Sequence, residues 1–318
     1  MNLFADEIEQ TSIDRIRKFA KIAKAMGFEI AVGFSGGKDS CVIYDLCKRS
    51  GIDFKAYYNV AFESLITKRF IRDNYPDVIW RRDYKYGFIE NIWKNYGGLL
   101  PTVYMAYCCD NYKHNSKYVD KCSIVGVRKS ESARRKERTV FEAKNKTVMK
   151  NNKALIDDYF EEHCQSTGNA SVIQLKPIID WADNDVWDYI HKHNLSINPE
   201  YEYSKRVGCV VCPKANFTSN YIGLMKYPKL IDAFILAKEK AGRNSPEDWN
   251  ITKGDKSYID DKPYYICRWL NHSFMPFTKK QEEFYRKVRE KYDLKQIRKE
   301  NNYANNTKRN LSNGQERT

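Results

Sequence analysis

A glycine-rich turn joins an apolar run to a helical segment near the start of the chain. The apolar residues 28–33, FEIAVG, lead into FSGGKDS at 34–40, and a helical pattern continues from Asp39 through Cys47. A strand–loop–helix unit presents unpaired backbone N–H groups at the positive end of the helix dipole, where phosphate groups bind. The glycine, lysine and serine residues exceed what a plain turn needs, so this segment predicts an anion site in an α/β fold.

Strand-like and helix-like segments alternate along the chain around this loop. A helical period covers residues 5–26, and further helices are expected at 63–74 and 87–96. Strands are expected at 29–34, 54–62, 77–82, 122–127 and 171–179. This alternation predicts a Rossmann-like α/β fold, with a doubly wound, mostly parallel sheet covered by helices on both faces. Ligands bind at the carboxyl ends of the strands in such sheets, and the glycine-rich loop follows the first strand.

Composition divides the chain into three expected regions. Residues 1–217 are expected to form the nucleotide-binding α/β domain, with a lysine- and asparagine-rich insertion at about 136–169. From residue 218 the pattern is helical only, so 218–297 are expected to form a helical C-terminal appendage. The polar, basic residues 298–318 are expected to be a disordered tail.

The charge of the chain indicates what it binds. Its 318 residues include 55 lysines and arginines against 41 aspartates and glutamates, a net charge of +14. Such an excess favours polyanionic partners such as nucleotides, tRNA or DNA, although a solvated basic surface explains it equally well. The sequence has no apolar run of about 18 residues and no secretory signal pattern. We therefore expect a cytoplasmic protein with no membrane partner.

The glycine-rich loop does not match the two most familiar nucleotide-binding motifs. Walker A requires Gly-x4-Gly-Lys-Ser/Thr, but Val32 occupies the position of its first glycine and Asp39 follows the lysine. The dinucleotide motif G-x-G-x-x-G is absent as well. A tight turn without a ligand is the structural alternative.

Five stretches occur in an order that narrows the alternatives. They are SGGKDS (35–40), CCDNYK (108–113), GVRKSESARR (126–135), PIIDWADNDVWDYI (177–190) and NPEYEYSKRVGCVVCP (198–213). Together they resemble the phosphoadenosine-phosphosulfate (PAPS) reductase family of the PP-loop, or N-type ATP pyrophosphatase, superfamily. More narrowly, they resemble its bacterial and phage branch, to which the DNA phosphorothioation ATP pyrophosphatase is related. The resemblance covers about residues 28–240 and implies an adenine nucleotide alpha hydrolase-like fold.

The resemblance also implies a nucleotide site. The residues that it assigns to the β- and γ-phosphates of ATP·Mg²⁺ are Ser35, Gly36, Gly37 and Ser40. Lys38 would neutralise charge at the α-phosphate, and Asp39 would hold Mg²⁺ or cap the helix. In the family, arginines of the GVRKSESARR stretch bind the anionic tail of the nucleotide, which assigns Arg128 and Arg134 to that role. A solvated basic turn is the alternative for this stretch.

Two other features have ordinary structural interpretations. In the stretch 177–190, Asp183 is expected to be the N-cap of a helix with a buried apolar face. Glu63 follows the second strand, where the family often has an acidic residue near the adenosine. A carboxylate at a helix N-terminus explains Glu63 equally well.

Four of the nine cysteines occur in pairs. Cys108 and Cys109 together with Cys209 and Cys212 would supply four thiolates, which fit Zn²⁺ or a [4Fe–4S] cluster. Two unrelated thiol pairs are the alternative. The arrangement is similar to the CC…CxxC set that holds a [4Fe–4S] cluster in the adenylyl-sulfate reductase branch, and this resemblance favours iron–sulfur over zinc.

The sequence departs from true sulfonucleotide reductases in two respects. Those enzymes carry a nucleophilic cysteine in a C-terminal tail, whereas no cysteine follows Cys267 here. The loop also keeps the ATP-cleaving form. We therefore expect adenylation of an acceptor with pyrophosphate release, in sulfur transfer to a nucleic acid or a small molecule. A sulfur-donor protein such as a cysteine desulfurase would then be a partner. The alternatives are an APS or PAPS reductase that releases sulfite, and a non-catalytic nucleotide- or nucleic-acid-binding module with a structural metal.

Overall fold

The computed structural model divides the chain into two compact units. It describes residues 3–82, 84–114, 121–143, 154, 156–157, 163–165, 173–244, 261–270 and 277–296. Unit 1 consists of residues 1–84 and 107–209, and unit 2 consists of residues 85–106 and 210–318. The sequence placed residues 85–106 with the nucleotide-binding domain, whereas their contacts group them with the C-terminal helices. The boundary expected after residue 217 stays a prediction, and the expected tail at 298–318 lies outside the described residues.

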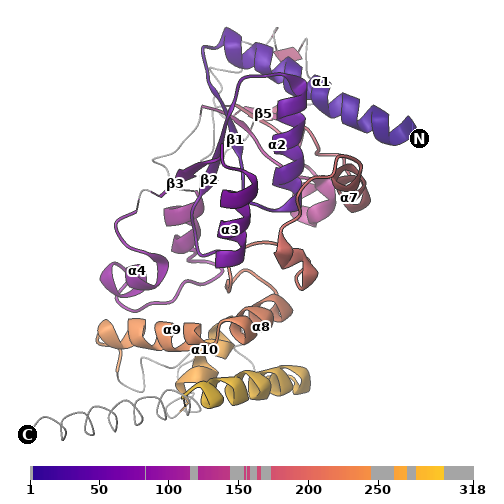
Figure 1. Cartoon of the computed structure of the whole chain (residues 1–318). Helices are drawn as coiled ribbons and strands as arrows, with labels where there is room; N and C mark the ends of the chain where they lie inside the picture. Colours follow the sequence, from indigo (N-terminus) through magenta and orange to yellow (C-terminus); the bar gives the residue numbers. More distant parts are fainter. Residues whose placement is uncertain are drawn as a thin grey trace, which may run out of the picture. The chain divides into compact units, whose positions relative to one another are not determined.

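Unit 1 is built on a seven-stranded sheet with the order β3-β2-β1-β4-β7-β5-β6. The neighbouring strands β3, β2 and β1 can be followed in Figure 1. The strands are β1 (Ile30–Gly33), β2 (Lys55–Asn59), β3 (Ile79–Arg81), β4 (Cys122–Ile124), β5 (Phe141–Ala143), β6 (His163–Gln165) and β7 (Ile173–Leu175). All neighbouring strands are parallel except β5 and β7, which are antiparallel. The five strands expected from the sequence are all present, and the prediction of a mostly parallel sheet is confirmed.

The sheet places two loops next to each other at the point where the strand order reverses. Val32 of β1 pairs with Ala56 of β2 on one side and with Ile124 of β4 on the other. Because these strands are parallel, the segments that follow β1 and β4 leave the same edge of the sheet. A reversal of this kind is where ligands bind in open α/β sheets.

The helices of unit 1 follow the predicted pattern. They are α1 (Leu3–Ala25), α2 (Lys38–Ser50), α3 (Leu65–Asn74) and α7 (Asp183–Lys192), and α2 packs against both α1 and α7. On α1, Ile16, Phe19 and Ile22 are fully buried at the spacing of a helical face. Burial of such apolar faces is the main stabilising contribution to this core.

The segment expected to be an insertion contributes to the sheet. Strands β5 and β6 both lie within 136–169, and Phe141 of β5 is fully buried against Phe19 of α1, with ring centroids 6.0 Å apart. The sequence did not predict these strands. Most of residues 144–172 lie outside the described part of the chain.

Unit 2 is helical in its described residues. It contains α4 (Phe88–Lys94), α8 (Phe217–Lys226), α9 (Lys229–Lys240), α10 (Lys262–Leu270) and a helix that spans 279–296. Phe234 of α9 is fully buried and lies edge-on to both Phe88 and Trp269. The indole N–H of Trp269 donates to the carbonyl of Pro101 at 2.7 Å. The predicted helical character of the C-terminal region is confirmed. No helix within the described ranges combines the length and the apolar character needed to cross a membrane.

Candidate nucleotide site

The loop after β1 ends at the N-terminus of α2. Gly36 has φ +71°, a left-handed conformation that favours glycine, and a Cβ there would come within 3.0 Å of the Ile71 side chain. Gly37, with φ −88° and ψ 157°, is the N-cap of α2 and has no side chain with which to cap the helix. No side chain of the loop caps α2; the N–H of Lys38 donates to the hydroxyl of Tyr201, and the N–H groups of Ser40 and Cys41 donate to the carbonyl of Gly37. The positive end of the helix dipole at this terminus still favours anions.

The two serines of the loop form hydrogen bonds within the loop. The hydroxyl of Ser40 donates to the carbonyl of Gly37 at 2.7 Å and accepts from the N–H of Ser35 at 3.2 Å. The two hydroxyl oxygens of Ser35 and Ser40 also lie 3.2 Å apart. Because a hydroxyl has one proton, Ser40 must rotate before it can donate to a phosphate. Its assignment to ATP, like that of Ser35, stays a prediction.

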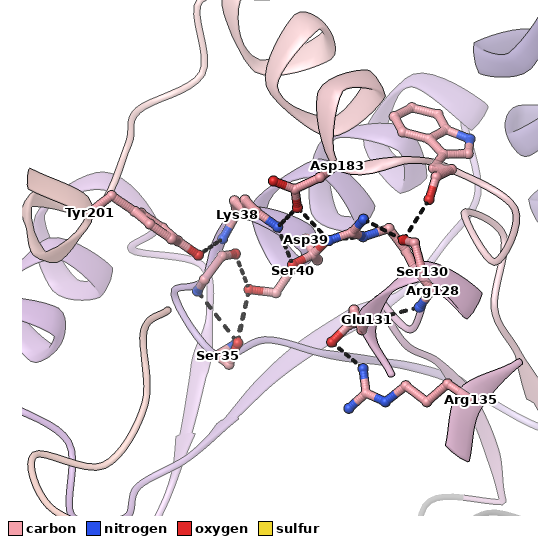
Figure 2. Close-up of polar contacts among 12 residues, drawn as sticks. Ser35, Lys38, Asp39, Ser40, Arg128, Ser130, Glu131, Arg135, Asp183 and Tyr201 are labelled. Atoms are coloured by element: carbon pink, nitrogen blue, oxygen red, sulfur yellow. Dashed lines mark hydrogen bonds and ion pairs between the residues drawn. The ribbon is translucent and has the colours of Figure 1, made fainter. Parts of the chain in front are cut away.

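Two cations and two carboxylates meet beside the loop (Figure 2). Nζ of Lys38 lies 3.2 Å from Oδ2 of Asp39 and 2.9 Å from Oδ1 of Asp183. Arg128 donates from Nε to Oδ1 of Asp39 at 2.6 Å and from Nη2 to Oδ1 of Asp183 at 2.9 Å. Lys38 and Arg128 are only 8% and 3% exposed, so each needs a counter-charge. The structure thus brings together Lys38, Asp39 and Arg128, which the sequence assigned to one site.

Arg128 is held in place by the segment that follows β4. Its Nη1 donates to Ser130 at 2.9 Å, and its backbone N–H donates to Glu131 at 3.1 Å. Upstream, Gly126 approaches α2 so closely that a Cβ there would lie 3.0 Å from the backbone of Asp39. Burial alone would lower the pKa of Arg128, but the charge of Asp39 and the hydrogen bond to it outweigh burial and raise the pKa. The guanidinium is therefore a fixed, permanent cation beside the loop.

Asp183 is a member of this group that the sequence did not predict. It was expected to be the N-cap of α7, and this was wrong: Ala182 is the N-cap, and its N–H donates to Asp185 at 2.7 Å. Asp183 is instead the first helical residue. The pKa of Asp183 lies below its ordinary value, mainly because Lys38 donates a hydrogen bond to it, with Arg128 adding to the effect. No local pattern marks this role, because the partners of Asp183 lie in two distant segments.

A second set of contacts that the sequence did not predict comes from residues 198–201. Asn198 is 1% exposed and donates to the carbonyl of Gly36 and to Thr67, both at 3.1 Å. The hydroxyl of Tyr201 accepts from the backbone N–H of Lys38 at 2.9 Å. Burial raises the pKa of Tyr201, so the phenol stays protonated. The loop is thus held between its own helix and a segment more than 160 residues away.

The other basic residues of the 126–135 stretch have separate environments. Lys129 pairs with Asp180 at 3.0 Å, and Asp180 also pairs with Arg15 at 2.8 Å. Arg135 pairs with Glu131 (Figure 2). Arg134 belongs to the short 3₁₀-helix Ala133–Arg135, but its side chain lies outside the described part of the chain, so its role stays a prediction.

A buried polar cluster lies beyond the end of β2. Glu63 is 8% exposed and accepts from the Tyr58 hydroxyl and the Ala61 N–H, both at 2.9 Å. Nζ of Lys113 lies 3.3 Å from Glu63, and Glu63 forms an isolated β-bridge with Cys209. Burial alone would lower the pKa of Lys113, but Cys209 and Glu63 outweigh it and raise the pKa. Glu63 therefore has structural partners in this cluster.

The predicted metal ligands are distributed over both units. Cys108 directly precedes the π-helix Cys109–Lys113 of unit 1, and Cys209 lies at the end of unit 1. Cys212 belongs to unit 2, where its backbone N–H donates to Asn220 at 2.8 Å. Within the described ranges, no group of three or more His, Cys, Asp or Glu side chains is arranged to hold a metal ion. The four-cysteine site therefore stays a prediction.

Sequence comparison identifies the family. The model described as the phosphoadenosine phosphosulfate reductase domain matches residues 29–215, more than half of the chain. The chain belongs to the phosphoadenosine phosphosulfate reductase family. The resemblance inferred from the five stretches is thereby confirmed. Membership in this family supports the binding of an adenine nucleotide.

Relatives with curated names are similar over much of this chain. An adenosine 5′-phosphosulfate reductase of Lysinibacillus sphaericus is 24% identical over 204 residues, which cover 60% of this chain and 76% of the reductase. Sulfate adenylyltransferase subunit 2 of Shewanella amazonensis is 22% identical over 209 residues, covering 61% of this chain and 67% of the subunit. An uncharacterised protein of Methanocaldococcus jannaschii is 23% identical over 256 residues, covering 76% of this chain and 55% of the relative. The chain thus spans about half the length of that archaeal relative.

Two solved structures align at low scores. The U34-tRNA thiolase NcsA from Methanococcus maripaludis with its [4Fe–4S] cluster has a TM-score of 0.34 and 12% identity, over 78% of this chain and 88% of that one. The NH3-dependent NAD synthetase from Campylobacter jejuni has a TM-score of 0.31 and 13% identity, over 78% and 97%.

Proposed function

We propose that this PAPS reductase family protein binds ATP·Mg²⁺ at the N-terminus of α2 and transfers its adenylyl group to an acceptor. One observation carries the proposal: two buried cations, Lys38 and Arg128, converge beside the N-terminus of α2 at the reversal point of the sheet. Positive groups fixed in this way stabilise the charge that develops on phosphate oxygens without reorganising during the reaction. Mg²⁺ enters as part of the nucleotide substrate.

The proposed reaction is a displacement at the α-phosphorus. An acceptor oxygen forms a bond to that phosphorus, the bond to the bridging oxygen of the β-phosphate breaks, and pyrophosphate leaves with the electron pair. The acceptor hydroxyl loses its proton to solvent or to a nearby base. Lys38 would neutralise charge at the α-phosphate, and Arg128 would hold phosphate oxygens with its planar fork. Asp39 orients both cations, because it contacts each of them from the first turn of α2.

The acceptor that we propose is a nucleic acid, either tRNA or DNA. The chain carries a net charge of +14, and most of this excess lies in the residues of unit 2 rather than in the sheet-containing unit 1. A basic unit joined to a nucleotide site suits a polyanionic acceptor. Sulfur transfer would follow adenylation and would need a sulfur-donor protein such as a cysteine desulfurase.

The four cysteines are included in the proposal on the basis of the sequence alone. Cys108, Cys109, Cys209 and Cys212 are the proposed ligands of a [4Fe–4S] cluster, with Zn²⁺ as the alternative, and no step above depends on either. Iron, sulfide and zinc analysis of protein purified without oxygen tests this assignment. A cytoplasmic location is part of the same proposal.

The name of the Lysinibacillus relative favours a second candidate, the reduction of a sulfonucleotide with release of sulfite. That reaction needs an accessible thiolate to attack sulfur. Cys267, the last cysteine of the sequence, is 3% exposed, and burial raises its pKa to about 12. It is therefore a poor nucleophile, and we rank reduction below adenylation. ATP binding without turnover would support a non-catalytic module instead.

ATP–pyrophosphate exchange tests the proposed function. Lys38→Met keeps most of the unbranched side chain but removes its charge, and we expect it to abolish exchange and ATP binding. Lys48→Met is the matched control, because Lys48 lies on the same helix but is half-exposed and pairs with Asp77. The proposal fails if wild-type protein neither binds ATP nor exchanges pyrophosphate with any acceptor, or if Lys38→Met matches Lys48→Met.

A further inference from the structure

We propose that Asp183 is an internal competitor that occupies the phosphate site of the free protein and leaves it when a nucleotide binds. This inference rests on the proposed function, because it concerns the same site. Asp183 places one oxygen, Oδ1, 2.9 Å from Nζ of Lys38 and 2.9 Å from Nη2 of Arg128. An oxygen shared by two cations in this way is in the position that a phosphate oxygen would take.

The exposed fractions of these side chains suit the replacement of Asp183 by a phosphate oxygen. The side chains of Lys38 and Arg128 are 8% and 4% exposed, so the protein fixes the cations in place. The side chain of Asp183 is 61% exposed, so it can return to water without loss of hydration. Asp39, the other carboxylate of the group, is 21% exposed and belongs to α2 itself. Of the two acids, Asp183 is the one that can leave.

The position of Asp183 on its helix also allows it to leave. The N-terminus of α7 is capped by the contact of Asp185 with the N–H of Ala182, so movement of the Asp183 side chain does not uncap the helix. The charge of the group explains why it must leave. Two cations and two carboxylates balance in the free protein, and a phosphate added beside Asp183 would face an uncompensated like charge.

The same contacts raise one competing interpretation. In that interpretation, Asp183 binds the Mg²⁺ that accompanies ATP, and its carboxylate assists nucleotide binding. The two interpretations predict effects of opposite sign when the carboxylate is removed. Inorganic pyrophosphate without Mg²⁺ isolates the competition, and ATP with Mg²⁺ includes any contribution of the metal.

Calorimetric titration of wild type, Asp183→Asn and Asp183→Ala with inorganic pyrophosphate tests the inference. Removal of an exposed competing carboxylate should tighten binding roughly threefold to tenfold in both variants, with or without Mg²⁺. Asp188→Asn is the matched control, because it makes the same charge change on an exposed position of α7. It should bind as wild type does, and circular dichroism melts confirm that each variant is folded.

The outcomes separate this inference from the proposed function. Unchanged or weaker pyrophosphate binding by both Asp183 variants overturns the inference, and weakening only when Mg²⁺ is present identifies Asp183 as a metal ligand. The proposed function survives these results if wild type binds ATP and Lys38→Met does not. Absence of binding by wild type and by both Asp183 variants overturns both proposals. Equal tightening by Asp188→Asn would show a general effect of charge and also overturns the inference.

Discussion

Replacing Arg128 with lysine tests whether the planar guanidinium, and not charge alone, organises the phosphate site. Arg128 donates to Asp39, Ser130 and Asp183 at the same time, at 2.6, 2.9 and 2.9 Å. A lysine ammonium is a compact point charge on a flexible chain, so it cannot reproduce this fork of three contacts. Arg128→Lys therefore keeps the net charge of the site but loses the planar arrangement of three hydrogen bonds.

The size of the effect follows from the burial of each contact. A hydrogen bond to a charged group contributes about 1.5–3 kcal/mol, and the Asp39 contact falls in this range because it is short and mostly buried. The Asp183 contact contributes about 0–1 kcal/mol, because that carboxylate is 61% exposed. A lysine retains part of both. We expect the free energy of unfolding to fall by about 1–2 kcal/mol and ATP affinity to fall about tenfold.

Calorimetry with ATP measures the affinity, and urea unfolding measures the stability. Arg135→Lys is the matched control, because Arg135 lies in the same stretch and pairs with Glu131. It should bind ATP as wild type does. If Arg128→Lys binds ATP as tightly as wild type, the fork has no role in recognition and the reasoning is refuted. Equal losses in the two variants would show that the effect does not belong to Arg128.

Two further predictions concern stability. Burial alone would raise the pKa of Glu9, but hydrogen bonds from Lys192 and His193 lower it, so Glu9 stabilises the fold above its unfolded pKa and the stabilisation is lost on acidification. Glu9→Gln should therefore flatten the fall in Tm below about pH 4.5, and an unchanged slope would contradict this. Lys176 is fully buried 2.6 Å from Glu142, so Lys176→Met should lower the free energy of urea unfolding by about 3–5 kcal/mol. Adding Glu142→Leu should recover most of that loss, and no recovery would show that the two charges are not coupled.

The loop and its neighbouring strands were predictable because their signals are local. The apolar run before FSGGKDS marks β1, and the glycines mark the turn into α2. Arg128 was assigned to the nucleotide by the family resemblance, and one rule gives a physical reason for its position: the carboxyl ends of parallel strands share an edge of the sheet. With β1 paired to β4, that rule alone brings Arg128 to the loop.

Strands β5 and β6 were not predictable in the same way. Each has three residues, and they lie in a lysine- and asparagine-rich segment that has no alternating apolar pattern. Phe141 is part of the core, where it packs against residues distant in sequence such as Phe19 of α1. Strand formation here depends on tertiary packing more than on intrinsic preference, which a single sequence does not reveal.

The distant partners of the loop were missed for a related reason. Asp183 precedes an apolar helical pattern, where an aspartate ordinarily caps the helix, whereas in the structure Ala182 and Asp185 form the cap. Tyr201 contacts the Lys38 amide across 163 residues of sequence. A polar residue whose partner lies so far along the chain gives no periodic or spacing signal.

Burial itself explains why the site contains an acid that the loop motif would not predict. Lys38 and Arg128 are desolvated in the free protein as well as in any complex, so their charges must be balanced in both states. Asp39 contacts both cations but carries a single negative charge, which leaves one positive charge without a balance. In the proposed complex, phosphate supplies the second negative charge. The group that supplies it in the free protein must then move away, so it must be a side chain outside the loop that stays hydrated. Asp183 meets both requirements, because it lies on α7 and remains mostly exposed while one of its oxygens joins the two cations.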